Sequence, residues 1–192
     1  MIAKQRTLMW LPCLLLTLAM TACGSTTTFK TEDGTTEVKK DGSEITVNTK
    51  EGETTTIKSQ DENTVQIESN KSDGSGGKTT LKSSNEIPAS FPKDIPLPDD
   101  AETTGSIETN TDGKESIIVT IHTNKELSEL ETMYKQYFKD NNVSNSMQMV
   151  QSDVLLFSGE LDGNTIAISG SASGDASKGM DLSISWSKNA AK

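Results

Sequence analysis

The side chains that carry most enzyme chemistry are sparse in this 192-residue chain, which has two cysteines and a single histidine. His122 follows a run of β-branched residues and alternates away from the apolar positions of that run. A catalytic triad or a histidine metal cluster needs converging partners, and no spacing in the sequence supplies them. We therefore interpret His122 as a half-exposed residue at a strand end. The sequence indicates no cofactor and no metal site.

Carboxylates are plentiful, but their spacing matches no site motif. Asp99, Asp100 and Glu102 lack the spacing of an EF-hand, which favours a solvated turn over a calcium site. An enzyme that works through paired carboxylates would need several of them to converge in one pocket. The acids of the C-terminal third that we consider for this role are Asp153, Glu160, Asp162 and Asp175.

The N-terminal segment has the layout of a secretory signal peptide. It carries Lys4 and Arg6, no acidic residue, and an apolar run from Leu8 to Ala22. This run is shorter than the roughly 20 residues that a membrane-spanning helix takes. Small residues stand directly before Cys23 at the end of the run.

The residues Met20-Thr21-Ala22-Cys23 resemble the lipobox of bacterial lipoproteins, with Met20 where Leu is commonest. In that family the cysteine thiol receives a diacylglycerol, the signal peptide is cut before it, and the new N-terminus is usually acylated. The resemblance implies lipidation of Cys23 and a lipid-anchored protein on the extracytoplasmic face of the cell membrane. The alternative is an ordinary secretory signal with an incidental cysteine. Cys13 would leave with residues 1–22, so no thiol would remain for a disulfide.

The charge balance excludes one class of partner. The chain has 28 acidic and 18 basic side chains and a formal net charge of −10, and Arg6 is its one arginine. Nucleic acid is a poor partner for such a surface. Anionic lipid headgroups would repel it as well, so we expect the folded part to stand away from the membrane.

Residues 23–68 form a Thr-rich stalk with a regular rhythm. Asp33-Gly34, Asp41-Gly42 and Glu51-Gly52 recur roughly every eight to ten residues, and such pairs favour hairpin turns. The apolar side chains of residues 24–85 are few: Phe29, Val38, Ile45, Val47, Ile57, Val65, Ile67 and Leu81. Two interpretations stay open, a polar β-meander in a single layer and a disordered tether. Residues 69–86, which are rich in Gly and Ser, are predicted to be a flexible linker.

Residues 87–192 are predicted to form the folded domain, beginning with a Pro-rich lead-in. Four prolines lie between Pro88 and Pro98 and favour a stiff, extended segment. Phe91, Ile95 and Leu97 are expected to attach this lead-in to the domain. The alternative is a proline-rich recognition peptide.

The pattern after residue 101 predicts one helix among antiparallel strands. Thr123 to Glu126 matches a capping box, and the residues that follow line one helical face up to about residue 141: Leu127, Leu130, Tyr134, Tyr137 and Phe138. The predicted strands are 103–110, 117–121, 147–151, 154–161, 164–169 and 180–186. The fold class expected is α+β: a C-terminal antiparallel sheet packed by one amphipathic helix, preceded by the Thr-rich meander or tether.

The lead-in followed by strand, Tyr-bearing helix and further strands resembles small, uncharacterised envelope lipoproteins over residues 87 to about 187. The resemblance implies an envelope location and assigns no residue a role. We expect a binding or scaffolding module, not an enzyme, that is held at the membrane for an envelope protein or cell-wall partner. The alternatives are an enzyme acting on envelope polymers and a passive surface spacer. Exposed apolar area on the sheet face or around Phe91 would favour binding over spacing.

Overall fold

The computed structural model describes residues 26–70, 77–174 and 179–189, and most of these lie in one antiparallel β-sheet. The first six strands are β1 (Thr26–Thr31), β2 (Gly34–Lys39), β3 (Glu44–Thr49), β4 (Thr54–Ser59), β5 (Val65–Asn70) and β6 (Lys78–Ser84). The remaining elements are β7 (Glu102–Thr111), β8 (Lys114–Thr123), α1 (Leu127–Asp140), β9 (Ser144–Gln151), β10 (Val154–Leu161), β11 (Asn164–Ala172) and β12 (Met180–Ser187).

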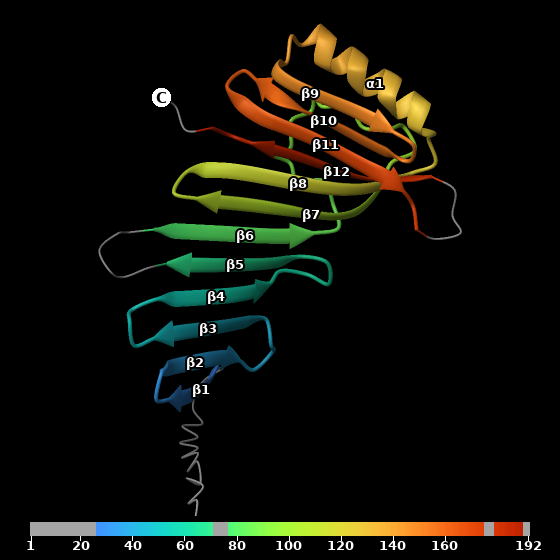
Figure 1. Ribbon diagram of the computed structural model, residues 1–192. Coiled ribbons are helices and arrows are strands. Elements are labelled where there is room, and N and C mark those ends of the chain that lie inside the picture. The colour runs from blue at the N-terminus through green and yellow to red at the C-terminus, as the bar shows by residue number, and fades with distance from the viewer. Residues whose placement is uncertain (1–25, 71–76, 175–178, 190–192) are drawn as a thin grey trace, which may run out of the picture.

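The strands are stacked in a simple order, which Figure 1 shows from one end of the molecule to the other. β1 to β8 form a meander, and β12, β11, β10 and β9 follow in that order. The chain therefore crosses from β8 to the far edge through α1 and returns strand by strand until β12 pairs with β8. The two edges of this 12-stranded sheet are β1 and β9, at opposite ends.

The first six strands form a single layer, which we call the stem. None of the residues in these strands is buried, because within the described residues no helix or second sheet covers them. The turns fall at the predicted pairs, where Gly42 and Gly52 adopt φ angles of 70° and 84° that an L side chain disfavours. The prediction of a β-meander is confirmed for these strands, and the alternative of a disordered tether is wrong.

The sheet also continues through part of the segment that the sequence predicts to be a flexible linker. Residues 78–84 form β6, in which Leu81 pairs with Ile67 of β5 and with Thr109 of β7. Pairing on both sides satisfies the backbone N–H and C=O groups of β6 and joins the stem to the C-terminal strands. The predicted α+β fold class with a Thr-rich tether is therefore wrong, since the protein is mostly β and one sheet runs through both halves.

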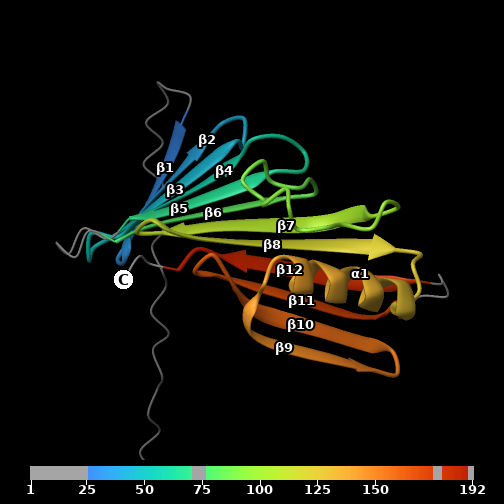
Figure 2. The ribbon, with the colours of Figure 1, turned by 90° about the horizontal axis from the view of Figure 1, so that it is seen from above.

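The C-terminal half has two layers. In Figure 2 α1 lies along one face of the strands β9 to β12. The buried apolar side chains of the sheet are Ile117, Val119, Ile121, Leu155, Phe157, Ile166, Ile168, Met180, Leu182 and Ile184. The helix buries Leu130, Tyr134, Tyr137 and Phe138 against them, as its predicted apolar face requires. Phe157 lies at the centre, with its ring centroid 5.5 Å from that of Phe138 and 6.1 Å from that of Tyr134.

The helix begins slightly later than its predicted capping box. Glu126 is the N-cap residue, and it exchanges capping-box hydrogen bonds with Glu129. The predicted cap residue, Thr123, is fully buried and donates its hydroxyl to Asp100 over 2.5 Å. Because the Thr123 hydroxyl is bonded to Asp100, Thr123 anchors the chain before the helix. The carboxylate of Glu126 caps the helix instead.

The Pro-rich lead-in packs onto the core, as predicted. Phe91 and Ile95 are only 6% and 3% exposed, and Leu97 packs against the same cluster. Asp100 holds the end of the lead-in by accepting hydrogen bonds from Thr123 and from the backbone N–H of Asn124, the latter at 2.9 Å. The side chains of Phe91, Ile95 and Leu97 are therefore used in packing, which leaves no free recognition motif at Phe91, while Ile87 at the start of the lead-in is 41% exposed.

Candidate binding surface

The register of the sheet assigns each side chain of the C-terminal half to one of two faces. Ile117, Val119 and Ile121 are buried under α1, so Ile118 lies on the opposite face, which we call the open face. Residues paired directly across strands share a face, so the pairs can be followed from strand to strand. One row on the open face runs through Ile107, Ile118, Ser185, Ala167, Ser158 and Met147.

Several large apolar side chains of this half remain exposed on the open face. Their exposed fractions range from 36% for Ile118 to 54% for Met147, and the set is Ile107, Ile118, Met147, Met149 and Val154. A wet sheet face normally carries polar side chains. Burial of one such side chain in an interface contributes roughly 1.5–3 kcal/mol, so these residues form a candidate contact surface.

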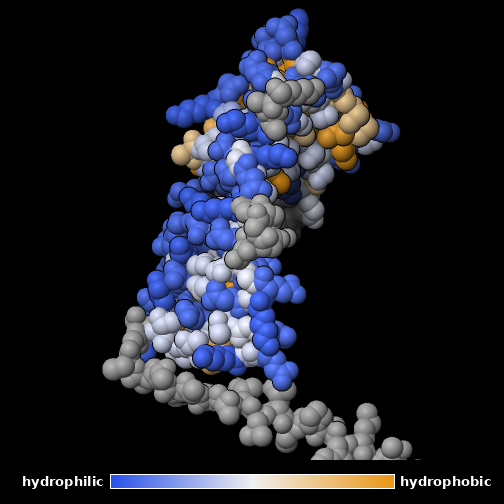
Figure 3. Space-filling view, turned by 90° about the vertical axis from the view of Figure 1, so that its left-hand side faces the viewer, coloured by the Kyte–Doolittle hydropathy of each residue, from blue (hydrophilic) through white to orange (hydrophobic). Residues whose placement is uncertain are grey.

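The apolar side chains flank a strip of small residues. β12 and β11 place Ser183, Ser185, Ala167 and Ser169 on the open face between Ile118 on one side and Leu156 on the other. Because all four of these side chains are small, none of them stands between Ile118 and Leu156. A partner with a flat surface can therefore contact both. Figure 3 shows hydrophobic atoms gathered in the upper part of the molecule, above a largely hydrophilic stem.

The stem presents a different surface. Five of its apolar residues form a cross-strand ladder in which each pairs with the next: Val38, Ile45, Ile57, Ile67 and Leu81. All five are half-buried by one another and by neighbouring threonines. Phe29 and Val65 lie outside this ladder and are 43% and 40% exposed. The other face of the stem carries charged pairs, such as Lys39 with Glu44 at 3.3 Å and Lys58 with Glu68 at 3.8 Å. The side chains of the ladder thus serve the sheet itself, through contacts of the kind that stabilise cross-strand pairs.

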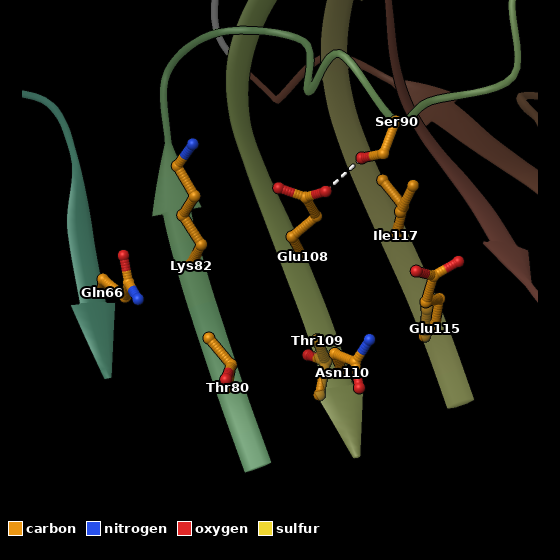
Figure 4. Close-up of a pocket in the computed structure, with 10 residues that line it drawn as sticks. Gln66, Thr80, Lys82, Ser90, Glu108, Thr109, Asn110, Glu115 and Ile117 are labelled. Atoms are coloured by element: carbon orange, nitrogen blue, oxygen red, sulfur yellow. Dashed lines mark hydrogen bonds between the residues drawn. The ribbon is translucent and has the colours of Figure 1, made fainter. Parts of the chain in front are cut away.

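A polar recess of about 230 Å³ lies where the stem meets the lead-in, on the face that α1 covers further along (Figure 4). Lys82 and Glu108 pair across β6 and β7 in this recess, and Ser90 of the lead-in donates a hydrogen bond to Glu108. Gln66, Thr80 and Asn110 add further polar groups. These groups offer hydrogen bonds to a small polar molecule.

The acids considered for catalysis do not converge where the structure describes them. Asp153 lies in the turn before β10, whereas Glu160 and Asp162 lie at the opposite end of that strand, and all three are exposed. Asp175 lies outside the described residues. The carboxylates near the lead-in have other partners: Asp99 forms an ion pair with Lys125 at 3.1 Å, and Asp100 binds Thr123. The hydroxyl of Thr123 and the N–H of Asn124 lower the pKa of Asp100.

His122 lies on the open face at the end of β8, as its alternation predicts. Its Nδ1 is 2.8 Å from a carboxylate oxygen of Asp181, its cross-strand neighbour on β12. In the part of the chain that the structure describes, no group of three or more His, Cys, Asp or Glu side chains is placed to hold a metal ion.

The tyrosines belong to the core, as the helical pattern predicts. Burial raises the pKa of Tyr134, whose hydroxyl has no hydrogen-bond partner within the described residues. Burial and the neighbouring Asp94 carboxylate raise the pKa of Tyr137, whose hydroxyl donates to Asp94 over 3.4 Å. Both hydroxyls therefore stay protonated over the whole physiological range.

Cys23, the predicted lipidation site, lies outside the described residues, three positions before β1 begins at Thr26. Within residues 26–70, 77–174 and 179–189, no helix is long and apolar enough to cross a membrane. Comparison of the chain with protein-family models, with curated proteins and with solved structures found no match.

The sequence patterns did not single out the exposed residues of the open face, although two signals pointed to them. The continuous run Ile117-Ile118-Val119 places apolar side chains on both faces of β8, and Met147 and Met149 alternate along β9. Such patterns fit equally well with strands that are covered on both sides. Only the position of α1 shows which of these side chains remain uncovered.

Proposed function

We propose that this protein is a membrane-anchored extracytoplasmic lipoprotein whose C-terminal half is a binding or scaffolding module in the cell envelope. A lipid anchor at Cys23 would hold the molecule next to β1. The stem would then act as a spacer, because β7 lies six strand spacings of about 4.8 Å, or about 29 Å, from β1. Its partner would be an envelope protein or a cell-wall component.

The observation that carries the binding role is the row of exposed apolar side chains on the open face. A passive spacer has no need of Ile107 and Ile118 side by side at 41% and 36% exposure. Contiguous apolar patches, unlike single scattered side chains, mark contact sites in soluble proteins. The aliphatic ladder of the stem is half-buried within the sheet, whereas Val65 of β5 is 40% exposed and lies in the same cross-strand row as Ile107, through Ser83.

The binding role is tested by photo-crosslinking in cells, followed by mass spectrometry. The double variant Ile107→Lys/Ile118→Lys should lose the crosslinked partner because it places two charges in the apolar row. The matched control is Thr111→Lys/Thr165→Lys, which adds the same charge at exposed open-face positions at the strand ends. Partner capture that is equal in both variants, or lost in both, contradicts a binding role for the row.

The anchor has a separate test. Replacement of Cys23 by Ser should abolish metabolic labelling by a fatty acid and partitioning into detergent, because serine lacks the thiol that accepts the lipid. Retention of the Cys23→Ser variant in the membrane would show that another feature anchors the protein.

A further inference from the structure

The edge strand β9 exposes a row of backbone hydrogen-bonding groups. Within the described sheet it pairs with β10 on one side only. Gln151 and Val154 flank the turn Ser152-Asp153 and must form a hydrogen-bonded pair, because a two-residue turn closes on such a pair. Hydrogen-bonded and non-hydrogen-bonded pairs alternate along an antiparallel ladder. Gln148 and Val150 therefore direct their N–H and C=O groups away from β10.

This edge lacks the protection that sheet edges normally have. β9 contains no charged residue and no proline over its eight residues, Ser144–Gln151. The opposite edge, β1, is shorter and carries Lys30. An irregular register near Asn145, which has a φ of 49°, is confined to the start of β9, and the register from Met147 to Gln151 is regular. Charges, prolines and irregularities are the usual means of blocking an edge, so the end of β9 is open to pairing.

The side chains of β9 define what a paired strand would meet. Met147 and Met149 lie on the open face with exposed fractions of 54% and 45%, and they end the apolar rows of that face. Methionine is unbranched and adapts to partners of different shape. Gln148 is exposed on the other face. An added strand would therefore place apolar side chains beside the methionines and polar ones beside Gln148.

The charged residues around β9 indicate which residue types suit the two ends of an added strand. Asp140 precedes β9, Asp153 follows it, and Glu160 accepts a hydrogen bond from Asn145 at 3.1 Å. The stretch 139–160 contains these three acids and a single basic residue, Lys139. A second copy of this chain would bring the same acids together, and each copy carries a net charge of −10. Basic residues complement this edge.

We propose that β9 binds an extended segment of a partner protein by β-strand addition. The segment has apolar side chains at alternate positions and Lys or Arg at its ends, and this inference rests on the binding role proposed above. Main-chain hydrogen bonds to Gln148 and Val150 supply affinity, and contacts with Met147 and Met149 supply specificity. Because β9 is the edge farthest from β1, the segment is captured at the end of the molecule that points away from the membrane.

The test uses the full chain in detergent and a fluorescent peptide, Lys-Lys-Thr-Val-Thr-Val-Thr-Val-Lys-Lys, with binding read by anisotropy. The variant Gln148→Pro removes one outward N–H and no bond to β10, since edge strands tolerate proline where the N–H faces solvent. The matched control, Gln148→Ala, keeps that N–H. Circular dichroism confirms that both variants are folded.

We expect saturable binding to the wild type and to Gln148→Ala, and at least tenfold weaker binding to Gln148→Pro. A peptide with Glu in place of its lysines should also bind at least tenfold more weakly. Hydrogen exchange should slow at Gln148 and Val150 when the lysine peptide is added. Failure of the lysine peptide to bind, or equal binding to the alanine and proline variants, overturns the proposal.

Sedimentation of the wild type addresses the other occupant of this edge. A dimer that dissociates in Gln148→Pro would identify a second copy as the partner strand and would also overturn the proposal. The outcome is separate from that of the crosslinking experiment. If the peptide fails but crosslinks still depend on Ile107 and Ile118, the binding role stands and only the assignment to β9 is lost.

Discussion

The stem and the C-terminal half are parts of one sheet, yet they are stabilised in different ways. In the C-terminal half, α1 and the lead-in bury one face around residues such as Phe157 and Tyr134, which are fully buried. In the stem both faces meet solvent, and stability comes from backbone pairing and from the ladder that includes Ile57 and Ile67. A sheet thus needs a second layer over only part of its width. Once some strands are covered on one face, further strands can be added at the edge, each stabilised by pairing with the strand before it.

This comparison predicts an asymmetric dependence between the halves. The stem has no core of its own, so it should unfold when the C-terminal half unfolds. The C-terminal half should tolerate damage to the stem.

Phe157→Ala should destabilise the whole protein. The side chain is fully buried between Phe138 and Tyr134, and removal of such a side chain costs about 3–5 kcal/mol of the free energy of unfolding. Chemical denaturation followed by circular dichroism measures the loss. Hydrogen exchange should accelerate in the stem as well as around the mutation, and an unchanged stem would contradict the dependence.

Gly34→Ala should detach the outer hairpin of the stem and little else. Gly34 has a φ of 154°, and an added Cβ would lie 2.0 Å from the backbone oxygen of Asn48. The cost of such strain is about 1–3 kcal/mol, which is enough to open an edge. Hydrogen exchange should accelerate in β1 and β2 while β7 to β12 keep their protection. Gly42→Ala is the control, because a Cβ added at Gly42 would meet no atom within 4 Å and the strain would come only from the φ of 70°.

Ile57→Ala should have a smaller effect than the loss of a core residue. Ile57 is half-buried, and its contacts are with Ile45 and Ile67 on the neighbouring strands. Cross-strand pairs contribute roughly 0.2–1 kcal/mol each, so the loss should be about 1 kcal/mol. The difference in denaturation midpoint between this variant and Phe157→Ala measures the contrast between the halves. Equal losses would show that the ladder acts as a true core.

Asp100→Asn should have the smallest effect, and only its pH dependence is diagnostic. The pKa of Asp100 is lowered by hydrogen bonds from Thr123 and Asn124. A carboxyl with a lowered folded-state pKa contributes stability above its unfolded pKa of about 3.9 and loses it as pH falls through the folded pKa. The wild type should therefore lose stability more steeply below about pH 4 than Asp100→Asn does. Parallel pH profiles of the melting temperature would contradict this role.

Much of the C-terminal half was predictable because its signals are local. The alternation of Met180, Leu182 and Ile184 gave β12, and the helical spacing of Leu130 and Tyr134 gave the buried face of α1. Each of these patterns reports one element that is buried on one side. The cap of α1 was misplaced because Asp100, 23 residues before Thr123, takes the hydroxyl that the local pattern assigned to the helix.

The sequence alone determined the turns, the amphipathic helix, the packing of the lead-in and the negative charge, since each depends on residues that are neighbours along the chain. It also carries the pattern at Cys23 on which the proposed anchor rests. Only the tertiary structure decided that residues 78–84 pair on both sides, that the stem joins the same sheet, and that Ile107, Ile118 and Met147 stay uncovered. Strand pairing and burial are relations between distant segments, and the same alternating pattern suits a strand at an edge, in a single layer or under a helix.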